Sequence, residues 1–225
     1  MKRFTVFSLC TLLCMAAFLT GCQKNATTQT PPTLLEQLSF SSTSDEFLQN
    51  FIVVDQGVLS LSITQHDAQY AGATSQGYED LSALLSQINK SSDKSQIQAY
   101  KEELELTRKG LLSKAAYSGS YDPYNVPECD HFLINFLYVE DNDVVLKITE
   151  EDAVKCGATI DGYRALNESI DIEMDDIVEK SSLTYQYLAQ AYDKRRADVL
   201  DPESPYNKFK NHLANGGDIT NYTGQ

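Results

Sequence analysis

The sequence predicts an α+β protein made of two tandem repeats, each a β-hairpin followed by helices, with the helices packed on a small antiparallel sheet. Three observations support this fold class: an internal duplication, short apolar runs of strand length, and helix-capping residues that recur after each run. The first repeat is expected to cover residues 45–129 and the second residues 130–211. A tail of residues 212–225 follows.

The duplication is the observation on which the fold prediction depends. Residues 45–81 align without a gap on residues 130–166, and 17 of the 37 aligned positions are identical. Average amino-acid composition would give roughly two or three identities by chance over this length. The same supersecondary unit is therefore built twice, with equivalent residues 85 positions apart.

Each repeat is expected to open with a β-hairpin. The runs Phe47–Val54 and Phe132–Val139 are almost continuously apolar and rich in aromatic and β-branched residues, as in strands covered on both faces. Turn-forming residues follow, and alternating apolar residues then mark a second strand at 59–63 and 144–148. We expect that the hairpins of the two repeats can pair into one sheet.

Helices are expected after each hairpin. Thr64 and Thr149 can act as helix N-caps, with an aspartate three residues later to meet the free amides. This short helix should end at Gly72 and at its counterpart Gly157, because glycine readily adopts the left-handed conformation that follows many helices. A second helix should begin two residues later, and a third amphipathic helix completes each repeat.

The amino terminus has the pattern of a secretory signal. Two basic residues precede an apolar run at 4–19, and two small residues stand before Cys22, so residues 1–21 are predicted to be removed. Residues 19–22 resemble the lipobox of bacterial lipoproteins. The resemblance implies cleavage before Cys22, diacylglycerol on its sulfur and further acylation such as palmitate. Several acyl chains would hold the protein on a membrane durably.

Residues 22–44 are predicted to be the lipidated cysteine and a flexible tether. Residues 23–33 are rich in Thr, Gln and Pro and show no apolar periodicity. The lipoprotein resemblance places the chain in the cell envelope, on the periplasmic side. Gln23 after the acylated cysteine is similar to lipoproteins of the outer membrane in Gram-negative cells.

The charge of the mature chain limits its partners. Without the signal it carries 16 basic against 32 acidic side chains, a net charge of −16. Such a surface repels nucleic-acid phosphates and anionic headgroups, so we expect no nucleic-acid partner. A basic envelope protein is the favoured macromolecular partner, although the charge alone also serves the solubility of an exported protein.

Two cysteines remain in the folded part, and they are predicted to form a disulfide. Cys129 and Cys156 are an even pair in an oxidising compartment, and the first repeat lacks both, with Ser44 and Ala71 in their places. A bridge of this span would contribute on the order of 3–4 kcal/mol.

No catalytic or metal-binding motif is recognisable, and no cofactor is expected. The one candidate polar site comes from the repeat: His66 aligns with Glu151, and His131 aligns with Glu46. A twofold relation between the repeats could bring these exchanged positions together, but solvated polar residues are the favoured interpretation. The acidic segments 140–143 and 171–176 could bind a cation, although they lack the spacing of a calcium loop.

These observations favour a membrane-anchored, non-enzymatic binding or accessory protein of the cell envelope. An immunity or inhibitor protein that covers a basic exported partner would use the acidic charge to speed encounter. Two alternatives stay open: an envelope enzyme with a site between the repeats, and an acidic cation-binding protein.

Overall fold

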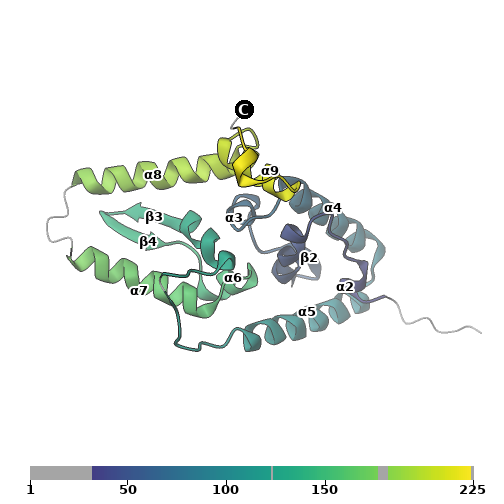
Figure 1. Cartoon of the computed structure of the whole chain (residues 1–225). Helices are drawn as coiled ribbons and strands as arrows, with labels where there is room; N and C mark the ends of the chain where they lie inside the picture. The colour runs from purple at the N-terminus through teal and green to yellow at the C-terminus, as the bar shows by residue number, and fades with distance from the viewer. Residues whose placement is uncertain (1–31, 123, 177–181, 224–225) are drawn as a thin grey trace, which may run out of the picture. The chain divides into compact units, whose positions relative to one another are not determined.

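The computed structural model describes residues 32–122, 124–176 and 182–223, without the side chains of residues 171–176. The signal at 1–21 and Cys22 lie outside the described residues. The predicted duplication is confirmed, because the same elements follow one another twice (Figure 1). The first repeat consists of the 3-10 helix η1 (Thr43–Phe51), strands β1 (Ile52–Asp55) and β2 (Val58–Leu61), and helices α3 (Gln65–Tyr70), α4 (Ser75–Ser91) and α5 (Lys94–Lys114).

The second repeat has the corresponding elements in the same order. They are η2 (Glu128–Phe136), β3 (Leu137–Glu140), β4 (Asp143–Leu146), α6 (Glu150–Lys155), α7 (Ile160–Asp176) and α8 (Ser182–Leu200). Helix α9 (Pro205–Ala214) and the 3-10 helix η3 (Ile219–Asn221) follow. Part of the predicted tail at 212–225 is therefore helical. Among the residues that the structure describes, none of the helices combines the length and the apolar character that a membrane span requires.

Each hairpin is tight and stands between two helices. Gln56 and Gly57 in one turn, and Asp141 and Asn142 in the other, have positive φ, as two-residue type I′ turns require. Helix α5 packs on β1 and α4 on β2, and likewise α8 packs on β3 and α7 on β4 (Figure 1).

The expectation that the hairpins pair into one sheet is wrong. The described strands form two separate two-stranded antiparallel sheets. The reason is that side chains of the third helix occupy the edge of each first strand. An Nη atom of Arg108 donates to the backbone oxygen of Ile52 at 3.2 Å, and one of Arg196 donates to that of Leu137 at 2.5 Å.

The first predicted strand begins too early in both repeats. Phe47–Phe51 and Phe132–Phe136 lie in the 3-10 helices, and the strands start only at Ile52 and Leu137. Within Thr43–Phe51 the buried residues are Asp45, Leu48 and Phe51, three positions apart, which is the 3-10 helical period. A continuous apolar run does not by itself distinguish a strand from a buried helical segment.

The predicted helix boundaries are confirmed. The Thr64 and Thr149 side chains accept from the amides of Asp67 and Asp152, both at 3.1 Å. Gly72 and Gly157 follow the short helices with φ of 109° and 100°. The third helices are offset by 88 residues, since Arg108 and Arg196 make equivalent contacts.

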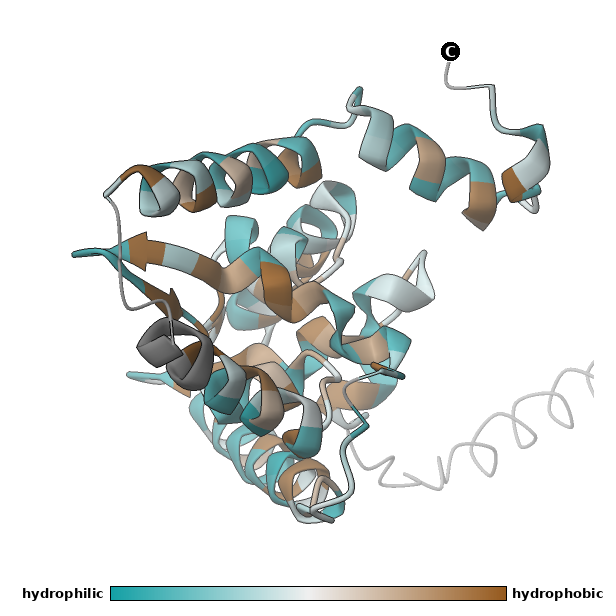
Figure 2. Cartoon of the chain, turned by 60° about the vertical axis from the view of Figure 1, so that its left-hand side comes forward, coloured by the Kyte–Doolittle hydropathy of each residue, from teal (hydrophilic) through white to brown (hydrophobic). Residues whose placement is uncertain are grey.

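The predicted tether at 22–44 is wrong for its last part. The compact unit of the chain begins at Thr33, and helix α2 (Leu34–Gln37) belongs to it. Leu34 is completely buried in the core of the first repeat, and Leu38 and Phe40 pack against that core. In Figure 2 the helices carry alternating apolar and polar bands, as expected of amphipathic helices around a core.

The two repeats contact each other reciprocally. Asn50 Nδ2 donates to the backbone oxygen of Lys155 at 3.0 Å, and Asn135 Nδ2 donates to that of Tyr70 at 2.9 Å. Asn50 and Asn135 are equivalent positions, and so are Tyr70 and Lys155. This exchange is the pattern of an isologous interface around a pseudo-twofold axis.

Candidate functional site

The histidine and glutamate pairs suggested by the repeat are not brought together. His66 is exposed, with its ring centroid 6.5 Å from that of Tyr70, and His131 Nε2 lies 3.2 Å from the backbone oxygen of Val126. Glu151 pairs instead with Lys155 at 2.8 Å. Both residues of each predicted pair are among the described residues, and neither pair forms an ion pair. This arrangement therefore offers no acid–base site.

The predicted disulfide is wrong, because both cysteines are free in the structure. Cys156 is buried in the core cluster of the first repeat, whereas Cys129 is exposed at the start of η2. The repeats' packing therefore directs the two thiols into different environments. Burial raises the pKa of the Cys156 thiol, and partial desolvation together with the nearby Asp130 carboxylate raises the pKa of Cys129.

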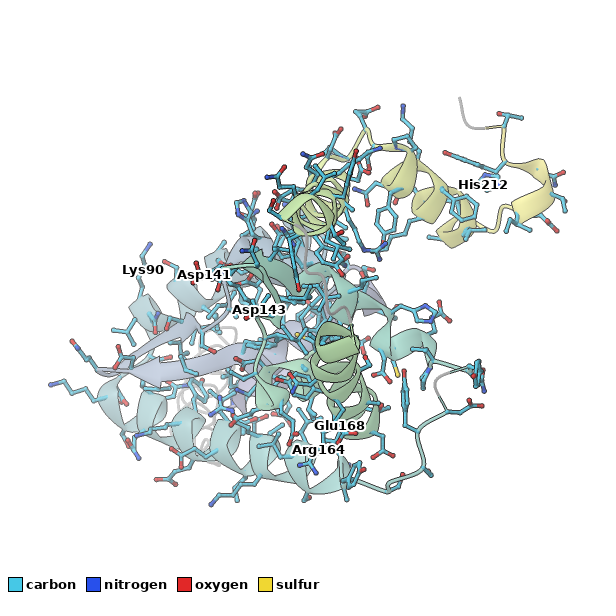
Figure 3. The ribbon with its side chains drawn as sticks, turned by 90° about the vertical axis from the view of Figure 1, so that its left-hand side faces the viewer. Lys90, Asp141, Asp143, Arg164, Glu168 and His212 are labelled. Atoms are coloured by element: carbon cyan, nitrogen blue, oxygen red, sulfur yellow. The ribbon has the colours of Figure 1, made fainter. Side chains whose placement is uncertain are left out.

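The acidic segment 140–143 is the turn of the second hairpin. Asp141 and Asp143 lie close together at this turn (Figure 3), and Glu140 forms an ion pair with Lys147. No group of three or more potential metal ligands is present among the described residues. The side chains of the second acidic segment, 171–176, lie outside the described residues.

Two buried aspartates, which the sequence did not single out as functional, prove to be structural. Asp45 Oδ1 accepts from the amide of Thr74 at 2.6 Å, and its Oδ2 accepts from the Thr74 hydroxyl at 2.9 Å. Asp130 binds Thr159 in the same way, with both distances 2.6 Å. These carboxylates join the 3-10 helix of each repeat to the start of its first long helix, α4 or α7.

The best candidate site is an open groove in the second repeat. It has a volume of about 420 Å³. Its apolar wall comes from the segment before η2, from η2, β3 and α7, and consists of Tyr121, Val126, Leu133, Ile134, Leu137 and Leu166. Val126 and Ile134 are each more than a third exposed. The groove therefore offers apolar surface to a ligand without refolding.

Polar groups mark one part of this groove. Arg195 and His131 line it, together with the carboxylate of Asp130. Arg195 Nε donates to Asn135 Oδ1 at 2.5 Å, which orients the side chain, and its guanidinium lies 5.9 Å from the ring centroid of Tyr206. Burial, followed by the charges of Asp130 and Asp122, raises the pKa of Tyr121 and so keeps its phenol neutral.

Comparison with protein-family models, curated proteins and solved structures finds no match. The chemistry of the groove is therefore the basis for a functional conclusion.

Two further recesses lie between the repeats, with volumes of about 590 and 670 Å³. Equivalent residues from both repeats line them, such as Phe51 and Phe136 in the smaller one and Phe47 and Phe132 in the larger one. The charged groups of the smaller recess are engaged elsewhere: Glu150 pairs with Arg164 at 2.7 Å, for example. These recesses therefore follow from the packing of the duplicated units.

One feature of the sequence indicates the groove, namely a difference in composition between the two repeats. Segment 34–40 of the first repeat carries four large apolar residues, whereas its counterpart at 119–125 carries Tyr121 and Tyr124 together with Gly, Ser, Asp, Pro and Asn. The identities between the repeats begin only at Asp45, so the repeat alignment does not reveal this contrast.

Proposed function

We propose that this chain is a lipid-anchored, non-enzymatic binding protein of the cell envelope, and that the groove of the second repeat holds its ligand. The single observation that carries the proposal is an exposed apolar groove with a fixed guanidinium at its side. Apolar surface supplies binding free energy, and one oriented charge supplies selectivity. None of this requires a reacting group.

The anchor is tested by labelling and fractionation. Cys22→Ala should abolish incorporation of labelled palmitate and release the chain from the membrane fraction. Cys14→Ala, a matched change inside the signal, should leave both unchanged. Labelling that survives Cys22→Ala would refute the anchor.

The groove is tested with an apolar anion. We expect 1-anilinonaphthalene-8-sulfonate to bind with one dominant site, its rings on the apolar wall and its sulfonate near Arg195. Ile134→Gln should weaken binding by about tenfold, since a loss near 1.4 kcal/mol corresponds to that factor. Gln is the residue of the first repeat at this position, so the fold should tolerate it. Leu106→Gln, on an exposed face of α5, is the control.

The acidic charge supports a basic envelope protein as the partner, in the manner of an immunity or inhibitor protein. The net charge of −16 on the mature chain would speed encounter with a cationic surface. The association rate with such a partner should fall steeply between about 50 and 500 mM salt, because the screening length shortens over this range. A rate that is indifferent to salt would exclude this version of the proposal.

A further inference from the structure

We infer that the groove of the second repeat receives a short helical segment of a partner protein, with leucines four residues apart and a carboxylate near them. This inference rests on the proposed function and names the ligand class of the same site. It is carried by the first repeat, in which the equivalent face is already covered by such a segment.

The covering segment of the first repeat is residues 34–41. Helix α2 is closed by a capping box between Thr33 and Glu36, and Leu34 is completely buried. Leu38, one turn later, packs against the same core. Ser39, Phe40 and Ser41 continue past Gly77 and Leu81, with which they line a recess. The segment therefore contacts α5 through helix α2 and α4 through residues 39–41.

The open groove is the same face in the second repeat. Leu133, Leu137 and Leu166 line it, and they correspond to Leu48, Ile52 and Leu81, which share a core cluster with Leu34. Gly162 of the groove corresponds to Gly77. The second repeat thus keeps the surface that receives a leucine-bearing turn but has none of its own.

The chain of the second repeat is held away from this surface. Ser118 donates from its backbone amide to Asp161 Oδ1 at 2.9 Å, and its hydroxyl also donates to that carboxylate. The Arg164 guanidinium lies 4.8 Å from the ring centroid of Tyr117. Figure 3 shows Arg164 on α7, one turn before Glu168. These contacts fix residues 117 and 118 on α7, and of the four residues that correspond to α2 only Tyr121 lines the groove.

The polar contacts of the two faces differ, and the difference indicates the charge of the ligand. In the first repeat Glu103 accepts from the amides of Leu34 and Leu35 at 2.8 and 3.1 Å. With the third helices offset by 88, the counterpart of Glu103 is Ala191, and Arg195 stands at the position of Thr107. The second groove therefore binds a carboxylate rather than helix amides.

Neither the predicted tether of this chain nor a second copy is a suitable occupant. Residues 23–31 contain no leucine, isoleucine, valine or phenylalanine. A second copy would have to withdraw its own Leu34 from a fully buried position, and the amides of its α2 would lose Glu103. A partner segment that is free to form one helical turn would lose neither a buried leucine nor these hydrogen bonds.

The test uses the mature full chain and a synthetic peptide with the sequence of residues 33–41, acetylated and amidated. We expect saturable one-to-one binding by fluorescence anisotropy of a labelled peptide, with a Kd below about 1 mM, the strength of a weak specific contact. The matched peptide with serine in place of Leu34 and Leu38 should not bind. Ile134→Gln should weaken binding by about tenfold, which corresponds to a loss of 1.4 kcal/mol, and Leu106→Gln should leave it unchanged.

A second measurement does not depend on peptide affinity. A chain in which residues 118–125 are replaced by the sequence of residues 33–40 should fill its own groove, raise the urea midpoint and lose the bound anilinonaphthalene sulfonate. If the sulfonate binds to the unmodified chain but neither the peptide nor the graft occupies the groove, the inference is overturned and the proposed function stands. If the sulfonate also fails to bind, both are overturned.

Discussion

Substituting alanine at Gly77 or Gly162 should destabilise the protein far more than a helical glycine-to-alanine change normally does. A Cβ built on Gly77 would lie 2.2 Å from Oδ2 of Asp45 and 2.3 Å from its Cγ. At Gly162 the Cβ would lie 2.1 Å from Oδ2 of Asp130. Both aspartates are buried, so their carboxylates have nowhere to move without losing their partners.

The magnitude follows from the bonds that would break. Each carboxylate accepts two hydrogen bonds from a threonine. Hydrogen bonds to a charged group contribute about 1.5–3 kcal/mol each. Alanine itself favours a helix over glycine by about 0.5–1 kcal/mol. The expected net loss in the free energy of unfolding is therefore about 2–5 kcal/mol for either substitution.

The assay is urea unfolding of the two variants beside Gly110→Ala. Gly110 lies in α5, where nothing stands within 4 Å of the position that a Cβ would take, so alanine there should stabilise by about 0.5–1 kcal/mol. The variants should differ in midpoint with an unchanged m value. If Gly77→Ala proves as harmless as Gly110→Ala, the buried carboxylate does not occupy the space beside the helix, and the reasoning fails.

Three further predictions concern the turn, the thiols and an ion pair. Asn142→Gly should raise the free energy of unfolding by roughly 0.5–1 kcal/mol in urea melts, because φ is 65° there; a loss would contradict the turn geometry. In the chain without residues 1–22, a thiol reagent at pH 8 should modify exposed Cys129 slowly and buried Cys156 only after unfolding, counted by absorbance. The Arg164 hydrogen bond lowers the pKa of Glu150, so its contribution is present at neutral pH and is lost as pH falls through the lowered pKa. Glu150→Gln should therefore cost less than about 1 kcal/mol at pH 7 and nothing at pH 2, measured by urea midpoints across pH.

Much of the fold could be predicted because the same pattern occurs twice. A capping threonine or a terminal glycine is a weak signal alone, but its return 85 residues later at the same place in the pattern makes it specific. The threonine caps, the glycine helix ends and the hairpins follow from this repetition. The first strand does not, because a run such as Phe47–Val54 is apolar on too many positions to show its period.

The candidate site could not be predicted by the same argument. Duplication identifies what the repeats share, whereas the groove depends on what the second repeat lacks. Its wall also combines side chains from four elements, and their convergence requires the tertiary structure. The disulfide prediction failed for a related reason. The number of thiols in the sequence gives no information on the repeat interface that buries Cys156.

The exchange of Asn50 and Asn135 across the axis has a consequence for stoichiometry. A symmetric homodimer of one such unit would have to present two identical faces, both open or both closed. Covalent fusion removes that constraint, because each half can then change alone. This chain has one covered half and one open half, so the proposed ligand would bind at one site per polypeptide.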